Sequence, residues 1–183
     1  MLLGATGCKK DPLKTLPKAT QEGKNTMGCL VDGKAWTPQG SSGCLTGCGA
    51  VEPIFARWRR LRTNGLGGGF TLSFDRIKKD ETQSYLSFFA PRLVQASTVA
   101  LDQAADPFLN GSNPAYGRYI HYSSLPYPDY RTGPDASGTL ILTRFDTVAC
   151  IAAGTFSFTG RHAASGQTVQ VTEGRFDVRF AKQ

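Results

Sequence analysis

Apolar and polar residues alternate in short segments along most of the chain, and turn-forming residues separate the segments. In residues 70–74, for example, Phe70, Leu72 and Phe74 alternate with polar side chains, which predicts a strand with one buried face. Similar segments, rich in β-branched and aromatic residues, occupy residues 55–61, 85–90, 139–145, 148–158 and 169–180. We therefore expect an all-β domain, a two-sheet antiparallel sandwich of the immunoglobulin-like or jelly-roll-like type, with a closed β-barrel as the alternative.

Two further segments refine this picture. Residues 27–31 and 34–37 flank an Asp32-Gly33 pair, and such a pair tolerates the positive φ angles of a tight turn, so we expect a hairpin. Residues 93–105 are ambiguous between helix and strand, because Ala, Leu and Gln favour a helix whereas Ser97-Thr98-Val99 favours a strand.

The length of 183 residues suits one domain, and the apolar content of 40% is globular. No apolar run approaches the roughly 20 residues that a membrane-spanning helix needs. The formal net charge is +7, and a concentration of lysines in residues 9–24 contributes much of it. The remaining excess is ordinary for a soluble domain, so composition alone does not predict nucleic-acid binding.

The first residues resemble the end of a bacterial lipoprotein signal peptide, because small residues precede a cysteine in Ala5-Thr6-Gly7-Cys8. The resemblance implies that Cys8 accepts a lipid. Lys9-Lys10-Asp11 resembles the charged stretch that favours surface display in lipoproteins of the Bacteroidota. We expect a signal-peptide end in residues 1–8, a flexible tether in 9–26 and a single β domain in 27–183. The protein would then be lipid-anchored in the cell envelope at the outer membrane, on its surface or its periplasmic face.

Four cysteines remain once Cys8 is assigned to the lipid, an even number that suits two disulfides in an exported protein. Three pairings are possible. We favour Cys29 with Cys150, which both lie in apolar strand-like segments, and Cys44 with Cys48, which would close a glycine-rich loop. Zinc held by Cys44, Cys48 and a third ligand is the rival interpretation, but paired Cys-x-x-Cys motifs are absent, so we expect no metal.

Both ends of the domain resemble a family of uncharacterised lipoproteins of the Bacteroidota that have a single all-β domain. The resemblance covers roughly residues 25–37 and 115–180, and its clearest motifs are Asn25-Thr26-Met27-Gly28-Cys29-Leu30-Val31-Asp32-Gly33, Gly138-Thr139-Leu140-Ile141-Leu142-Thr143-Arg144-Phe145-Asp146 and Glu173-Gly174-Arg175-Phe176-Asp177-Val178. It implies a fold and a location. The family has no assigned activity, so the resemblance transfers no functional residue.

Residue chemistry argues against catalysis. The nucleophile motif Gly-x-Ser-x-Gly is missing, and His121 and His162 are the only histidines. Asp146, Glu173 and Asp177 could in principle pair as acid and base, but their positions beside turns suit capping instead. We therefore expect a protein that is not an enzyme and has no cofactor.

Two clusters are candidates for ligand binding. Arg57, Trp58 and Arg59 belong to the densest basic segment, and guanidinium groups bind phosphate, sulfate or uronate groups. The other interpretation, which we favour for this segment, is a solvated edge strand that its charge protects from pairing. The second cluster, in a segment rich in proline and glycine, contributes Tyr119, Tyr122 and Tyr127. 

Because no combination of acid, base, nucleophile and electrophile converges in the sequence, we favour a non-enzymatic envelope lipoprotein that binds a glycan or a protein partner. A hydrolase with an unrecognised site and a purely structural envelope component remain the alternatives. We expect no nucleic-acid partner, and the oligomeric state is open.

Overall fold

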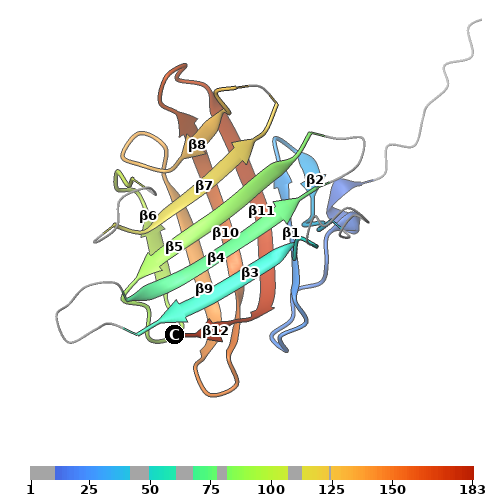
Figure 1. Ribbon diagram of the computed structural model, residues 1–183, viewed down its shortest axis with the longest axis vertical. Helices are drawn as coiled ribbons and strands as arrows, with labels where there is room; N and C mark the ends of the chain where they lie inside the picture. The colour runs from blue at the N-terminus through green and yellow to red at the C-terminus, as the bar shows by residue number, and fades with distance from the viewer. Residues whose placement is uncertain (1–10, 42–49, 61–67, 78–81, 107–112, 124) are drawn as a thin grey trace, which may run out of the picture.

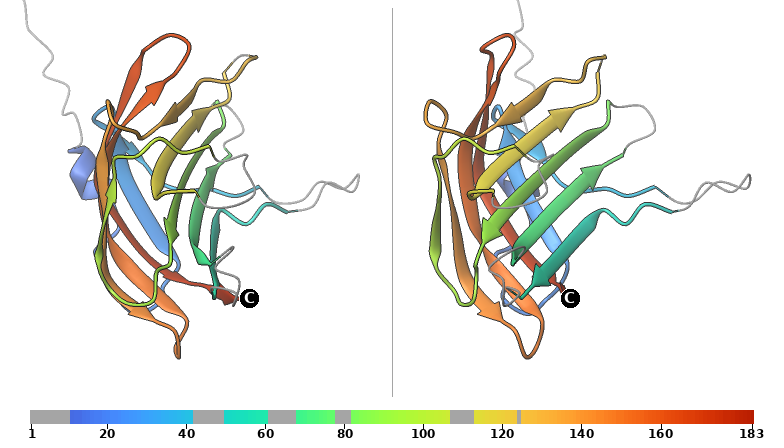
Figure 2. Two further views of the ribbon diagram at one scale, coloured as in Figure 1. Left: turned by 90° about the vertical axis from the view of Figure 1, so that its left-hand side faces the viewer. Right: turned by 60° about the vertical axis from the view of Figure 1, so that its left-hand side comes forward.

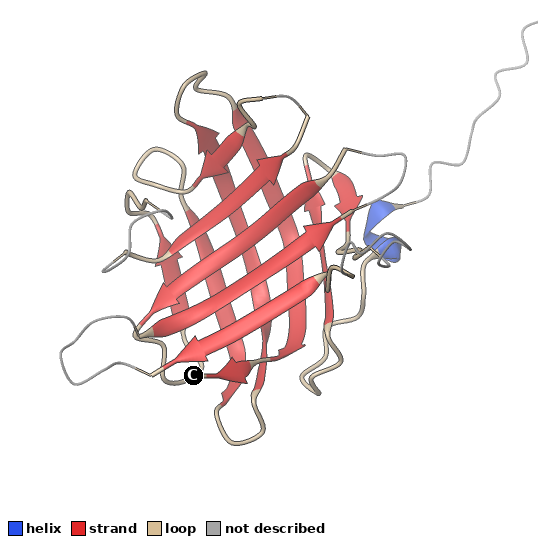
Figure 3. Cartoon of the chain, in the orientation of Figure 1, coloured by secondary structure: helices blue, strands red, loops and turns tan. Residues whose placement is uncertain are grey.

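The structure is a computed structural model that describes residues 11–41, 50–60, 68–77, 82–106, 113–123 and 125–183. Its one described helix is the short 3-10 helix η1 (Pro12–Thr15), and the regular structure is otherwise β (Figure 3). The strands are β1 (Thr26–Val31), β2 (Lys34–Trp36), β3 (Ile54–Arg59), β4 (Gly69–Arg76), β5 (Ser84–Pro91), β6 (Thr98–Leu101), β7 (Tyr116–His121), β8 (Asp129–Arg131), β9 (Gly138–Asp146), β10 (Ile151–His162), β11 (Thr168–Arg179) and β12 (Ala181–Lys182). The predicted all-β class is confirmed.

The described strands belong to one curled sheet, in which the main path runs β12-β3-β4-β5-β7-β8-β10-β11-β1-β2. Strand β9 pairs with β10, and β6 pairs with β9. The curl produces a half-barrel with two facing walls (Figures 1 and 2), one built on β3, β4, β5 and β7 and the other on β9, β10, β11 and β1. We expected two separate sheets, but β8 pairs with both β7 and β10 and so joins the walls by hydrogen bonds.

Aromatic side chains fill the space between the walls. Phe88 of one wall contacts Phe156 and Phe158 of the other, with ring centroids 4.7 and 5.6 Å apart. Phe70 meets Phe145 in an edge-to-face contact at 5.3 Å. The predicted buried face of residues 70–74 is confirmed, because Phe70, Leu72 and Phe74 are almost fully buried. The two walls are therefore held together mainly by apolar burial, which is the largest favourable contribution in such a core.

The local predictions near turns can also be tested. The hairpin of β1 and β2 is confirmed, and its turn residues Asp32 and Gly33 have φ angles of 48° and 74°. The ambiguous segment 93–105 contains strand β6 and no helix. No helix in the described part of the chain has the length and apolarity needed to cross a membrane.

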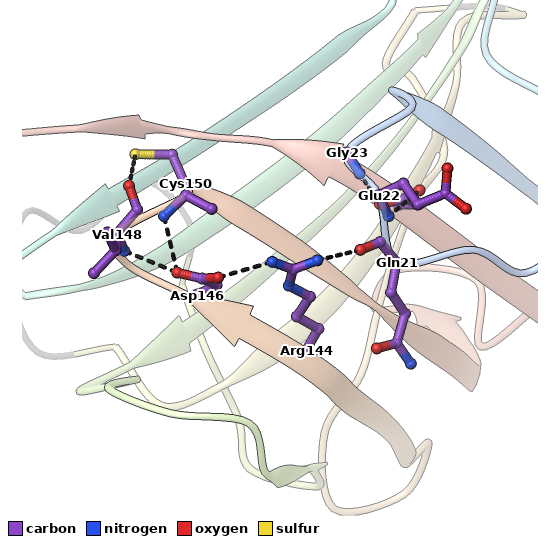
Figure 4. A network of polar contacts seen from close by, with 9 residues as sticks. Gln21, Glu22, Gly23, Arg144, Asp146, Val148 and Cys150 are labelled. Carbon is purple, nitrogen blue, oxygen red and sulfur yellow. Dashed lines mark hydrogen bonds and ion pairs between the residues drawn. The ribbon is translucent and has the colours of Figure 1, made fainter.

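The boundary between tether and domain is a correction. We predicted a flexible tether over residues 9–26, but residues 16–25 pack against the domain. Leu16 is buried, and the buried carboxylate of Asp177 accepts hydrogen bonds from the Thr20 hydroxyl and from backbone amides of residues 22–24. Nearby, Arg144 donates to both Asp146 and the Gln21 carbonyl (Figure 4). The polar composition of this segment therefore serves hydrogen bonding to the domain.

The predicted disulfide between Cys29 and Cys150 is absent, because both residues are free thiols. Cys29 lies in β1 between positions that pair with Arg175 and Thr172, whereas the Cys150 carbonyl accepts from Phe180 at the far end of β11. About six residues of extended strand, or about 20 Å, separate the two sites. A disulfide needs Cα atoms roughly 4.4–6.8 Å apart, so the fold prevents the bond. Cys8, Cys44 and Cys48 lie outside the described residues.

Candidate functional site

One open end of the half-barrel holds a pocket of about 580 Å³, here called the aromatic pocket. Strands β2, β5, β7 and β8 contribute its main side chains. They are Trp36, Ser84, Tyr119, His121 and Tyr130. Because neighbouring strands approach one another here, these residues converge from positions up to 94 numbers apart in the sequence.

Strand pairing explains the convergence. Tyr119 and His121 are two residues apart in β7, so both face the interior of the half-barrel. Register places Ser84 of β5 opposite His121, and Tyr130 of β8 opposite Tyr119. The hairpin turn at Asp32-Gly33 then brings Trp36 to the same end, where its Nε1 donates to the Ser84 Oγ over 2.8 Å.

The floor and the rim of the aromatic pocket differ in exposure. Trp36 and Tyr119 are 4% and 7% exposed and form the floor, whereas Tyr130 and His121 are half-buried and more accessible. The rings of Tyr119 and Tyr130 lie at a tilted angle with centroids 6.3 Å apart. The pocket therefore offers apolar ring surface beside groups that donate and accept hydrogen bonds.

The charge of the aromatic pocket is mixed. Lys34, Arg76 and Asp32 also line it, and Arg76 donates a 3.3 Å hydrogen bond to the Ala35 carbonyl. Burial raises the pKa of Tyr119 above its ordinary value, so its hydroxyl stays protonated near neutral pH. These groups can hold a polar ligand without requiring it to carry a large charge.

The structure separates the three predicted tyrosines. Tyr119 lies in the aromatic pocket. Tyr122 and Tyr127 form their own edge-to-face pair, with centroids 4.8 Å apart and side chains 36% and 43% exposed, and neither lines the pocket. Tyr122 lies just beyond the end of β7, where its amide donates to the Gln83 carbonyl.

The predicted basic cluster is also divided. The Arg57 guanidinium lies 4.7 Å from the centre of the Phe55 ring on the outer face of β3. Trp58 points the other way and donates from Nε1 to the Leu93 carbonyl over 2.8 Å. Arg59 donates to the Gln183 side chain. Trp58 and Arg59 thus line the same pocket, whereas Arg57 is not among its lining residues.

A second pocket, the basic pocket, contains Trp58 and Arg59 and lies at the opposite end of the sheet from the aromatic pocket. Its other cationic lining residues are Arg60, Arg92 and Lys182. Strand β4 runs from Gly69, opposite Arg59, to Arg76 at the aromatic pocket. Seven residue steps of extended strand correspond to about 23 Å between the two ends.

The residues considered for catalysis have structural contacts in this fold. Asp146 caps the turn after β9 by accepting from the Val148 and Ala149 amides, and it pairs with Arg144. Asp177 binds the N-terminal segment, as described above. The Ser165 hydroxyl, 2.8 Å from His162 Nδ1, also accepts from the Gln167 amide within the β10–β11 turn.

The same residues do not form a metal site. Among the residues described, no three His, Cys, Asp or Glu side chains lie close enough together to hold a metal ion.

Sequence reasoning missed most of the aromatic pocket. Trp36 lies in a predicted hairpin with no link to a site, and Tyr130, although it belongs to the same tyrosine-rich segment, is interpreted from the sequence as a residue that packs against the sheet. The two-residue spacing of Tyr119 and His121 was a usable signal, since it places both on one face of a strand. Ser84 carried no signal of its own, because strand register alone brings it to the pocket.

Searches with this chain matched no family model, no curated protein and no solved structure.

Proposed function

We propose that the protein is a non-enzymatic lipoprotein of the cell envelope that binds a glycan in the aromatic pocket. The observation that carries the proposal is the convergence of Trp36, Tyr119 and Tyr130 with Ser84 and His121 in one concave site. Saccharides present apolar ring faces edged by hydroxyl groups, so a site of this composition suits them. A protein partner would more commonly use a flatter and more exposed surface.

The accessible residues on the open side of the aromatic pocket are the ones that would contact a glycan. Tyr130 supplies an accessible ring, and His121 and Lys34 supply donors around it. Asp32 supplies a carboxylate acceptor on the same rim. The mixture favours a neutral or weakly acidic sugar over a polyanion.

The envelope location in this proposal rests on the sequence around Cys8, where Ala5-Thr6-Gly7-Cys8 resembles a lipoprotein processing site. Mass analysis of the N-terminal peptide from the native host tests it directly. A lipid on the amino-terminal cysteine is the expected result. An unmodified Met1 would overturn the location and leave the binding proposal to be judged separately.

Glycan-array binding of the full chain tests the pocket. We expect His121→Ala and Tyr130→Ala each to weaken retention on the bound glycans about tenfold, because each removes a contact worth roughly 1–2 kcal/mol. Tyr127→Ala is the matched control, since its ring lies outside the pocket, and it should leave retention unchanged. Circular dichroism confirms that each variant is folded.

Two array results would contradict the proposal. Equal retention of wild type and both pocket variants would move the binding elsewhere, and failure of the wild type to bind any glycan would remove the function. Chromatography of bound oligosaccharides after prolonged incubation tests the non-enzymatic assignment, because shortened products would reveal a hydrolase.

A further inference from the structure

The basic pocket has a volume of about 630 Å³ and lies where the end of β3, the segment after β5, the β9–β10 turn and β12 meet. It brings together residues from four parts of the sequence. Arg59 and Arg60 come from the predicted basic segment, whereas Arg92 and Lys182 are added only by folding.

Charge in the basic pocket is unbalanced. Four cationic side chains line it, and the described lining residues include no aspartate or glutamate. Several other arginines of the domain are ion-paired, including Arg118, Arg144 and Arg161. Arg60 and Lys182 form no ion pair with any described residue, nor does Arg92. Even with a carboxylate at Gln183, cations outnumber anions, so an incoming anion would be attracted to this end.

The backbone around these cations is fixed. Lys182 of β12 pairs in parallel with Trp58 of β3, and the Gln183 amide donates to the Trp58 carbonyl. Leu93 is buried in the core and accepts the indole hydrogen bond of Trp58. Arg92, immediately before Leu93, adopts a φ of 55°, a left-handed conformation that costs a non-glycine residue about 1 kcal/mol. Strand pairing and hydrogen bonds therefore hold the backbone that carries these cations in place.

An apolar margin accompanies the charge. Val94 lines the basic pocket and is 70% exposed, and Val148, which follows the lining residue Thr147, is 91% exposed. Aliphatic side chains with this exposure, next to clustered cations, are typical of surfaces that touch the boundary between lipid headgroups and acyl chains. Sugar recognition would instead favour several aromatic rings, as in the aromatic pocket, whereas Trp58 is the one aromatic ring among the described lining residues here and makes an edge-to-face contact with Phe145.

We propose that the basic pocket binds the phosphate headgroup of an anionic phospholipid, so that this end of the half-barrel contacts a membrane surface. Arg59, Arg60, Arg92 and Lys182 would hold the phosphate oxygens, because guanidinium and ammonium groups donate charge-assisted hydrogen bonds to them. Val94 and Val148 would reach the start of the acyl chains. The site is separate from the aromatic pocket, so the inference does not depend on glycan binding.

Vesicle sedimentation with the full chain carrying Cys8→Ser tests the inference without a lipid anchor. The probes are phosphatidylcholine vesicles and phosphatidylcholine vesicles containing phosphatidylglycerol. We expect binding only to the second, weakened by salt. The double variant R92Q/K182Q should bind roughly tenfold to thirtyfold less tightly, since each cation near an anionic surface contributes about 1 kcal/mol.

The matched control is K14Q/K24Q, which removes the same charge from exposed positions outside the basic pocket and should bind within about twofold of the parent. Val148→Ser should weaken binding without changing its salt dependence. Equal losses in both double variants would show attraction by net charge only and would overturn the assignment. Absence of binding to anionic vesicles, or binding to sulfated oligosaccharides but not to vesicles, would also overturn it.

Discussion

Thr20 donates a hydrogen bond of 2.6 Å to the Asp177 carboxylate, although 157 positions separate the two residues in the sequence. Amides of Glu22, Gly23 and Lys24 donate to the same carboxylate. Asp177 is 1% exposed, so water cannot replace these donors easily. The contact makes the N-terminal segment part of the domain.

Asp177→Asn should therefore destabilise the protein by about 2 kcal/mol. The asparagine side chain has no negative charge and one acceptor oxygen fewer than the carboxylate, which accepts from four donors. Urea unfolding followed by tryptophan fluorescence measures the change. Asp135→Asn is the control, since the Asp135 side chain is 79% exposed and pairs with Arg161 at the surface; we expect a change within about 0.5 kcal/mol. Equal effects of the two substitutions would contradict the structural role given to Asp177.

The same carboxylate predicts a dependence of stability on pH. Burial raises the pKa of Asp177, but its hydrogen bonds outweigh burial and leave the pKa below the ordinary 3.8. The pKa of Asp129 is lowered in the same way. Burial raises it, but the hydrogen bonds and positive charges of Arg118 and Arg131 lower it by more. Since folding favours the ionised forms, this stabilisation is complete above about pH 4 and is lost as pH falls through the lowered pKa values.

Thermal unfolding measured from neutral pH down to about pH 2 should show a falling Tm below about pH 4. The Asp177→Asn variant should have a shallower fall, because one of the groups that titrate is missing. A Tm that rises on acidification, or an unchanged slope in the variant, would mean that the native state does not favour ionised Asp177.

Gly154 lies at an irregularity in the pairing of β10 with β9. A Cβ there would overlap the Ile141 carbonyl oxygen, so Gly154→Ala should destabilise the protein by about 3 kcal/mol. Gly33→Ala is the comparison, because its Cβ would meet nothing within 4 Å and only the φ of 74° is unfavourable, at about 1 kcal/mol. Equal losses in chemical denaturation would contradict the close approach of β9 and β10.

The two described cysteines should differ in reactivity. Burial raises the pKa of the Cys29 thiol well above its ordinary value, whereas Cys150 is more accessible and its Sγ lies 3.9 Å from the Val148 carbonyl oxygen. In a variant with serine at positions 8, 44 and 48, a maleimide should label Cys150 in the native state and Cys29 only after unfolding. An intact mass two protons lower without reductant would reveal the Cys29–Cys150 bond that the fold excludes.

The strands could be predicted because their burial alternates every two residues, as in Phe70, Leu72 and Phe74. Their arrangement could not, because the pairing of β8 with both walls depends on only a few residues. Tyr119 was predicted as a site residue and lies in a pocket, but Ser84 and Lys182 reach theirs through long-range register. The Cys29–Cys150 prediction was wrong because both positions are strand-like in sequence, yet Cys29 in β1 and Cys150 before β10 lie beside positions of the β11 segment that are about six residues apart.

The central claim, glycan binding in the aromatic pocket, can be tested with the two tryptophans of the chain. Trp36 lines the aromatic pocket and Trp58 lines the basic pocket, so their indole N–H signals in a ¹⁵N–¹H correlation spectrum distinguish the two sites. Titration with the oligosaccharides selected on the glycan array should shift the Trp36 signal saturably and leave Trp58 in place. A Trp36 signal unmoved at saturation would contradict the account.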